Sequence, residues 1–132
     1  MIPPDVERLA TIGVDCACTV HRELGPGLLE SVYEECLATE ISARGLAFAR
    51  QVAAPRSFRG RRLDLAFRAD LILAGKIHFE LKAVEVLLPV HKAQTITYLK
   101  LIGLPLGFLI NFNVPYFREG IQRVINSVRT SR

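Results

Sequence analysis

The alternation of apolar and polar residues in the middle of the chain constrains the fold more than any other feature. Between residues 62 and 73 every odd position is apolar: Leu63, Leu65, Phe67, Ala69, Leu71 and Leu73. The even positions of the same segment include Arg62, Asp64, Arg68 and Asp70. From residue 76 to residue 83 the odd positions are again apolar and the even positions polar. Because successive side chains of a strand point to opposite faces, the sequence predicts two neighbouring strands, over 62–73 and 76–83.

The loop between these two strands decides which residues oppose each other. Both strands turn their apolar residues to one face only if the numbers of paired residues sum to an even value. A two-residue loop at 74–75 would pair Leu73 with Lys76, which sets an apolar residue against a polar one. A three-residue loop at 74–76 pairs Leu73 with Ile77 and keeps the pattern, and such loops commonly contain a glycine. The sequence therefore predicts a hairpin with a three-residue loop.

In this hairpin Asp70 lies directly opposite Glu80, with Cβ atoms about 5 Å apart. Two opposed carboxylates repel, so a bound divalent cation, a raised pKa or a neighbouring base must offset the repulsion. Lys82 and Arg68 lie on the same face, two positions along each strand. Such a face suits Mg²⁺ or Mn²⁺, since hard cations favour oxygen ligands. The pattern also allows a solvent-exposed sheet face with alternating charges, on which His78 would be solvated.

The remaining segments complete a mixed α/β architecture. Periodic apolar residues predict helices over 5–23, 28–44, 91–102 and 119–128, and shorter apolar runs predict strands over 48–58 and 105–111. In the second helix the residues expected to face inward are Leu29, Val32, Cys36, Leu37 and Ile41. The predicted order is α-α-β-β-β-α-β-α, with a mixed central β-sheet flanked by helices.

Length and composition limit the classes of protein to consider. A chain of 132 residues predicts a single domain over residues 1–132. The 17 Lys and Arg exceed the 13 Asp and Glu by four, which permits an anionic partner without requiring one. Three cysteines without a CxxC pair, no signal peptide and no apolar stretch long enough to cross a bilayer predict a cytoplasmic protein that does not bind membranes.

Basic residues gather in and before the second strand. They are Arg56, Arg59, Arg61, Arg62 and Arg68, to which Lys92 and Lys100 can be added. One interpretation is a rim that follows a phosphate backbone. The other is a solvated strand edge that charge protects from pairing with another chain.

Three motifs in order resemble a known group of enzymes. Asp70 followed by Glu80-Leu81-Lys82 is similar to the D…(D/E)xK signature of the PD-(D/E)xK nuclease superfamily, although Ala69 stands where that signature has proline. Residues 27–33, Gly-Leu-Leu-Glu-Ser-Val-Tyr, resemble the GxxExxY motif of one bacterial family in it. Gln94 and Tyr98 match the QxxxY element of its RecB-like branch. The resemblance implies a restriction-endonuclease-like core.

The resemblance also implies a role for each matching residue. Asp70 and Glu80 would be direct ligands of Mg²⁺ or Mn²⁺, with the backbone carbonyl of Leu81 as a third. Lys82 would position or deprotonate the attacking water, and Glu30 would complete the metal site. Taken alone, Glu30 is better explained by its place in the first turn of a helix, where a carboxylate favours the helix dipole; together with Asp70 and Glu80 it becomes a candidate for the metal site.

Substrate contacts follow from the same comparison. Gln94 and Tyr98, one turn apart on a helix, would position the scissile strand, and Arg68 would contact the substrate. Tyr33 is either a further substrate contact or a core aromatic residue. The implied function is a metal-dependent nuclease that acts on nucleic acid, with DNA favoured over RNA. A second copy of the chain (a homodimer) or another protein is a possible further partner. The alternative is a non-catalytic module that keeps the fold and binds nucleic acid or a protein partner.

Overall fold

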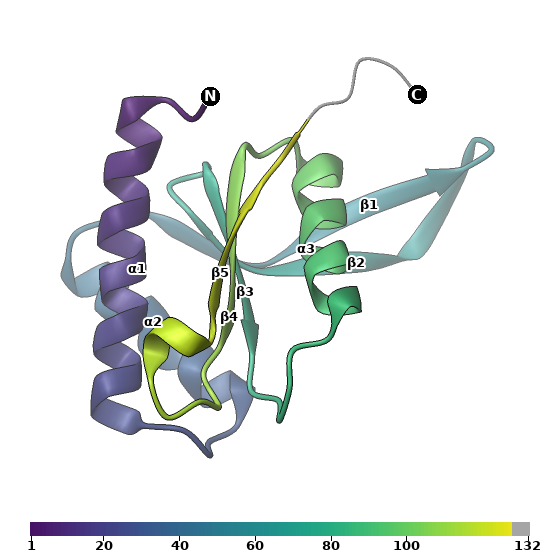
Figure 1. Ribbon diagram of the computed structural model, residues 1–132. Coiled ribbons are helices and arrows are strands. Elements are labelled where there is room, and N and C mark those ends of the chain that lie inside the picture. The colour runs from purple at the N-terminus through teal and green to yellow at the C-terminus, as the bar shows by residue number, and fades with distance from the viewer. Residues whose placement is uncertain (128–132) are drawn as a thin grey trace.

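The computed structural model describes residues 1–127, apart from the side chains of residues 55, 56 and 63–67. A five-stranded sheet forms its centre, with helices on both faces (Figure 1). The elements are α1 (Pro4–Leu24), α2 (Glu30–Ala43), β1 (Phe48–Phe58), β2 (Arg61–Leu73), β3 (Ile77–Lys82), α3 (Pro89–Ile102), β4 (Leu106–Asn111), the 3₁₀ helix η1 (Phe117–Glu119) and β5 (Ile121–Ile125). The expected α/β class is thus confirmed.

The strands follow one another across the sheet in the order β1-β2-β3-β4-β5. All neighbouring pairs are antiparallel except β3 and β4, which run parallel. A parallel pair needs a crossover connection, and α3 provides it. All six residues of β4 are buried, as expected for a central strand covered on both faces.

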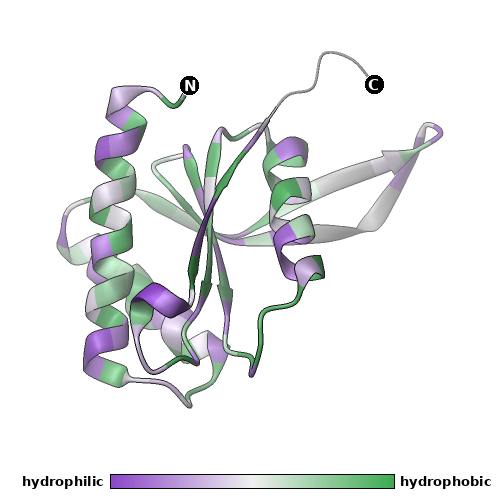
Figure 2. Ribbon diagram, in the orientation of Figure 1, coloured by the Kyte–Doolittle hydropathy of each residue, from purple (hydrophilic) through white to green (hydrophobic). Residues whose placement is uncertain are grey.

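The helices divide between the two faces of the sheet. α1 and α2 pack on one face, where their apolar side chains meet the odd-numbered residues of β2 and β3, such as Leu71 and Phe79. α3 packs on the other face, where Leu99 joins a smaller apolar cluster with Ile72 and Val124. Figure 2 shows apolar residues concentrated in the central strands and polar residues on the outer sides of the helices. No helix within residues 1–127 has the length and apolar character needed to cross a membrane.

The predicted hairpin register is confirmed where the strands pair. Leu73 lies opposite Ile77, Ile72 opposite His78, and Leu71 opposite Phe79. The loop contains the three residues 74–76, and Ala74 and Gly75 both have positive φ, at 52° and 66°. The apolar faces of both strands therefore point to the same core.

The helix predicted over 119–128 is wrong. Residues 117–119 form a 3₁₀ helix and residues 121–125 form β5, which pairs antiparallel with β4; residue 128 lies outside the described residues. The segment Ile-Gln-Arg-Val-Ile has apolar residues at helical spacing, but its β-branched residues favour a strand. Pairing with β4 also satisfies backbone groups that would otherwise be exposed at that edge of the sheet.

The second helix begins at Glu30 rather than at residue 28. Leu29 is the residue before the helix and is 73% exposed, and Val32 is also exposed, so neither faces inward as predicted. The buried positions are Tyr33, Glu34, Leu37, Ala38 and Ile41. Glu30 is thus the first residue of the helix, and it lies near enough to Glu80 and Lys82 at the end of β3 to interact with their charges.

Candidate functional site

The candidate site lies where β2 and β3 separate. Their last opposed pair is Leu71 and Phe79, and Asp70 and Glu80 come directly after it. In place of a further ladder contact, Asp70 Oδ2 accepts a hydrogen bond of 2.8 Å from the backbone N–H of Leu81. The side chain of one strand thus binds the backbone of the next, which holds the two carboxylates next to each other.

Glu80 is buried and has two neighbours on its own strand. Its Oε1 atom lies 3.0 Å from Nε2 of His78, and its Oε2 atom lies 3.6 Å from Nζ of Lys82. An ionised carboxylate only accepts hydrogen bonds, so the imidazole N–H donates to it. His78 has no exposed surface, so the expectation of a solvated histidine is wrong. The ring of Tyr98 from α3 packs against the His78 ring, with ring centroids 5.5 Å apart, and covers this part of the sheet.

β1 contributes a residue that joins two acidic groups. Nε2 of Gln51 donates to Oε1 of Glu34 on α2 at 2.7 Å and lies 3.5 Å from Oδ1 of Asp70. Gln51 has a φ of 51° and lies opposite Asp70 in the register of β1 and β2, between the pairs Arg50–Leu71 and Val52–Ala69. A residue other than glycine in this region of φ is strained, and such strain is typical of functional sites.

The charges around Asp70 make its ionisation costly. Burial, followed by the neighbouring Glu80 carboxylate, raises the pKa of Asp70 to about 7, while the hydrogen bond from Leu81 opposes the change. Glu30 and Glu34 of α2 act in the same direction as Glu80. The pKa of Glu30 is itself raised, first by burial, although the ammonium group of Lys82 lowers it. Acidic groups from three elements therefore share one region, in which Lys82 lies beside Glu80 and Arg50 pairs with Glu34.

The helix α3 brings the two residues of the QxxxY element to the same site. Tyr98 is 8% exposed, and burial together with the Glu80 and Asp70 carboxylates raises the pKa of its hydroxyl to about 12. Gln94 is half-buried and lies one helical turn earlier on the same side of α3. Tyr98 is therefore close to the carboxylate pair, and Gln94 lies one helical turn away from Tyr98.

Tyr33 has a structural position that differs from the predicted substrate contact. It is fully buried, its hydroxyl donates to the carbonyl of Gly25 at 2.6 Å, and it accepts from the N–H of Leu28 at 3.2 Å. Its ring stacks on Phe112 with centroids 4.6 Å apart. Tyr33 thus fixes the loop that leads to Glu30, and it has no surface with which to touch a substrate.

Two further positions complete the surroundings. Arg68 is exposed on β2 opposite Ala53, two residues before Asp70 and on the same side of the strand. Asn111, at the end of β4, binds the N–H and the carbonyl of Val84 at 3.0 and 2.9 Å through its side chain. This clamp fixes the chain directly after Lys82, and no sequence motif indicated it.

A family model described as the PD-(D/E)XK nuclease superfamily matches residues 7–124, which is nearly the whole chain. The chain belongs to the PD-(D/E)XK nuclease superfamily. No curated protein and no solved structure gives a significant match. Nucleases of this superfamily typically use divalent metal ions, and its members generally act on nucleic acid.

The donor atoms of this superfamily member fit a hydrated hard cation. Among the described residues no three His, Cys, Asp or Glu side chains surround one point. The carboxylates of Asp70 and Glu80 nevertheless lie close enough to interact, and Asp70 is bonded to the backbone N–H of Leu81. Mg²⁺ commonly takes one or two carboxylates and keeps several water molecules, so this donor set matches its preferences. A cation would also relieve the repulsion that raises the pKa of Asp70.

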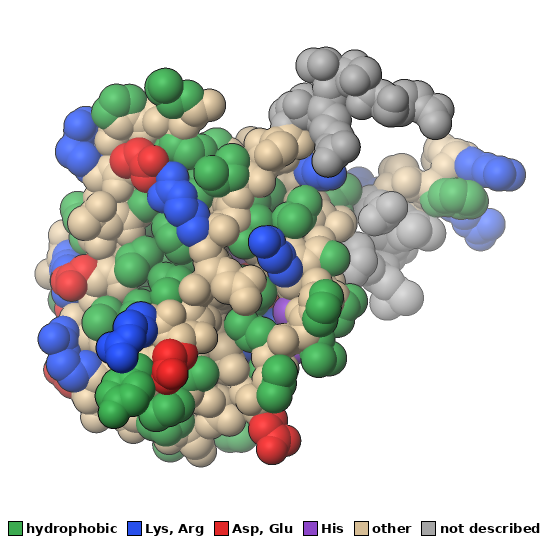
Figure 3. Space-filling model, viewed as in Figure 1, with side chains coloured by type: hydrophobic (Ala, Val, Ile, Leu, Met, Phe, Trp, Pro, Cys, Tyr) green, Lys and Arg blue, Asp and Glu red, His purple; other side chains and the backbone are tan. Residues whose placement is uncertain are grey.

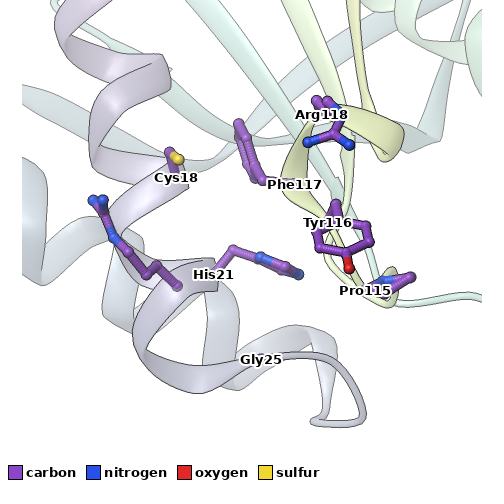
Figure 4. Close-up of a pocket in the computed structure, with 8 residues that line it drawn as sticks. Cys18, His21, Gly25, Pro115, Tyr116, Phe117 and Arg118 are labelled. Atoms are coloured by element: carbon purple, nitrogen blue, oxygen red, sulfur yellow. The ribbon is translucent and has the colours of Figure 1, made fainter.

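A separate cavity of about 520 Å³ lies away from these residues (Figure 4). It is formed by the end of α1, including Cys18 and His21, and by the segment 115–118. Nε2 of His21 lies 2.7 Å from the carbonyl of Val114, which joins the two sides. None of the predicted site residues of this nuclease-superfamily chain lines that cavity.

Proposed function

We propose that this chain is a Mg²⁺- or Mn²⁺-dependent nuclease of the GxxExxY type that hydrolyses phosphodiester bonds in DNA. The observation that carries the proposal is the carboxylate pair Asp70 and Glu80 at the end of the β2–β3 ladder, with Nζ of Lys82 3.6 Å from Glu80. Glu80 and Lys82 are two residues apart on one strand, so their side chains point to the same face of the sheet. This arrangement combines a site for a cation with a proton-carrying group.

Asp70, Glu80 and the carbonyl of Leu81 would hold the cation in this proposal. When bound, the cation supplies Lewis acidity, which makes water a better nucleophile and neutralises charge on the phosphate. The hydrogen bond from Leu81 N–H engages Oδ2 of Asp70, and Oδ1 has only the longer contact of 3.5 Å with Nε2 of Gln51. His78 binds Oε1 of Glu80, and Oε2 has only the 3.6 Å contact with Nζ of Lys82, so these two oxygens are the ones a cation would take.

Lys82 is the proposed group next to the attacking water. Its side chain is 20% exposed, so it reaches the surface where a substrate would lie, while Glu80 restrains its ammonium group. An ammonium group in this place orients the water and stabilises the negative charge that develops on the phosphate. Glu30 at the start of α2 would complete the site through water. It lies near enough to Lys82 for the ammonium group to lower the pKa of Glu30.

Gln94, Tyr98 and Arg68 are proposed to orient the scissile strand. Gln94 and Tyr98 present one side of α3 to the carboxylate pair, and exposed Arg68 brings positive charge to the same side of β2. Guanidinium groups bind phosphate through paired hydrogen bonds. Tyr33 acts indirectly in this proposal, because it holds the loop before Glu30.

The experiment is a cleavage assay with Mn²⁺ on labelled single- and double-stranded DNA and RNA. Wild type is compared with Glu80→Gln, which keeps the size of the side chain and its contact with His78 but removes the charge. The matched control is Glu23→Gln, at an exposed glutamate near the end of α1. We expect wild type and the control to cleave DNA and Glu80→Gln to lose at least about 100-fold in rate.

The other outcomes contradict the proposal in different ways. Equal cleavage by all three proteins would show a contaminating enzyme or a wrong site. No cleavage by any of them, together with salt-dependent binding that needs no metal, would favour the non-catalytic binding module. Preference for RNA would retain the metal site and correct the substrate.

A further inference from the structure

The β1–β2 hairpin ends in a tight turn far from either core cluster. Phe58 opposes Arg61, which leaves only Arg59 and Gly60 in the loop, with φ values of 51° and 76°. Positive φ at both loop residues defines a type I′ turn, whose twist continues that of the two strands. Figure 1 shows this hairpin extending past α3 and away from the helices. We call residues 57–62 the hairpin tip.

The side chains of the hairpin tip are basic and aromatic. Phe58 is 62% exposed, and the guanidinium group of Arg59 lies 5.2 Å from the centre of its ring. Arg61 and Arg62 are also exposed. Figure 3 shows basic and apolar side chains of this hairpin standing clear of the body of the molecule. From residue 51 to residue 63 the sequence has four arginines and no aspartate or glutamate.

Protection of a strand edge does not account for this composition. Charges that prevent strand pairing belong along the free edge of a strand, whereas Arg59 lies in the turn itself. Phe58, next to the turn, is mostly exposed and belongs to neither core cluster. A projecting basic ribbon with an apolar side chain instead complements a polyanion whose phosphates bind arginine and whose base edges offer apolar methyl groups.

We propose that the hairpin tip is a second contact with the substrate, in which the two-stranded ribbon enters the major groove of a DNA duplex. The inference rests on the proposed nuclease function and names its substrate as double-stranded DNA. The major groove of B-form DNA is about 12 Å wide and admits a two-stranded β-ribbon. The major groove of an RNA duplex is too deep and narrow for such a ribbon, and a single strand has no groove. Arg59, Arg61 and Arg62 bind phosphates at the sides of the groove.

The test measures binding without cleavage. Wild-type protein in EDTA is titrated into a labelled DNA duplex, an RNA duplex of the same sequence and the single DNA strand, at several salt concentrations. The variant Arg59→Asn/Arg61→Ala/Arg62→Ala removes three charges and preserves the fold, because Asn-Gly is the preferred pair for a type I′ turn. The matched control, Arg8→Ala/Arg22→Ala/Arg118→Ala, removes three exposed charges elsewhere. Thermal melting of each protein verifies that it is folded.

We expect the tip variant to bind the DNA duplex at least about tenfold more weakly, and the slope of log affinity against log salt to fall by about 2 to 3. The control should stay within about twofold, because its charges lie outside the contact. The RNA duplex and the single strand should show little difference between wild type and tip variant. Phe58→Ser should weaken duplex binding with an unchanged salt slope, since it removes no charge.

Three results would overturn the inference. Equal loss of duplex affinity in the tip variant and the control would show that net charge alone explains the effect. Equal loss on all three nucleic acids would remove the groove from the explanation. Unchanged duplex binding by the tip variant would exclude the contact. The metal-dependent cleavage assay with Glu80→Gln tests the nuclease separately. Metal-dependent cleavage together with unchanged binding by the tip variant would contradict the role of the tip alone. Weaker duplex binding by the tip variant without any cleavage would contradict the nuclease function alone.

Discussion

At the scale of single residues, the proposed site is assembled at a cost to folding. Asp70 lies next to Glu80, in a region that Glu30 and Glu34 also make negative. Burial alone would raise the pKa of Asp70, and these neighbours add to that effect. The ionised form of such a group disfavours folding of the metal-free protein, and a carboxylate kept at this cost is a candidate for binding a ligand.

Replacement of Asp70 by asparagine should therefore stabilise the metal-free protein while abolishing metal binding. The pKa of Asp70 is about 7 in the folded chain and 3.8 in an unperturbed chain, so the folded state binds the proton more tightly. Stability from this group is full below pH 3.8, falls as pH rises towards 7 and is lost above it. Asp70→Asn, which can still accept the hydrogen bond from Leu81, should gain about 2 kcal/mol over wild type above pH 7.

The measurement is urea unfolding of both proteins in EDTA across this pH range. The difference in unfolding free energy should be small near pH 4 and grow up to pH 7, because other titrating groups are common to both proteins. A difference that is independent of pH would contradict the raised pKa. Titration with Mn²⁺ in parallel should stabilise wild type and leave Asp70→Asn unchanged.

Site residues on strands with a clear alternation of apolar and polar residues were predictable from the sequence. Site residues whose position depends on an irregular backbone were not. Asp70, Glu80 and Lys82 followed from the alternation of the two strands, and the structure places them together. Gln51 could not be anticipated, because its place opposite Asp70 depends on the β1–β2 register and its positive φ is not indicated by a glutamine. The burial of His78 was missed because a polar strand face was taken as a solvated one, whereas Tyr98 covers it.

At the scale of elements, the close approach of α1 to the sheet fixes the face opposite the site. Gly13 is buried in α1, and a Cβ atom added there would lie 2.6 Å from Cζ of Phe79 and 2.9 Å from a methyl group of Leu73. Both distances are shorter than side-chain packing allows. The glycine thus lets the helix rest directly on the strands that carry Asp70 and Glu80.

Gly13→Ala should destabilise the protein although alanine favours helices. The helical preference of alanine over glycine contributes about 1 kcal/mol, whereas forced repacking of a tight core costs about 1 to 3 kcal/mol. We expect a net loss of about 1 kcal/mol in denaturant unfolding. Arg8→Ala, at an exposed position of the same helix, is the control and should change stability by less than about 0.5 kcal/mol. A stabilised Gly13→Ala protein would show that α1 moves away from the sheet at little cost.

Element types were easier to predict than their ends or their inner faces. The first seven elements have the expected type, since each has a clear period or length. The last failed because five residues are too few for periodicity to separate a helix from a strand, so the open edge of β4 determined the outcome. In α2 the predicted inner face was rotated, because Tyr33 is drawn inward by Phe112 and by its bonds to the preceding loop.

At the scale of the whole molecule, the chain has two cores of unequal size and a projecting hairpin. The larger core joins α1 and α2 to the sheet, the smaller one lies under α3, and the proposed site is on the α3 side beside α2. The hairpin tip belongs to neither core among the described residues. This division gives a rigid centre that holds the carboxylates and a projecting ribbon that meets a partner without disturbing them.

The same division predicts a gradient of local stability that hydrogen exchange can measure. Amides of β3 and β4 are hydrogen-bonded and buried on both faces, so they should exchange only through global unfolding. Amides of the hairpin tip are held by one pair of strands outside the cores and should exchange at least about 100-fold faster. Adding a DNA duplex in EDTA should slow exchange at the tip and leave β3 and β4 unchanged. Slow exchange at the tip without DNA would contradict the division, and DNA-induced slowing at the end of α1 instead of the tip would move the second contact to the cavity beside Cys18 and His21.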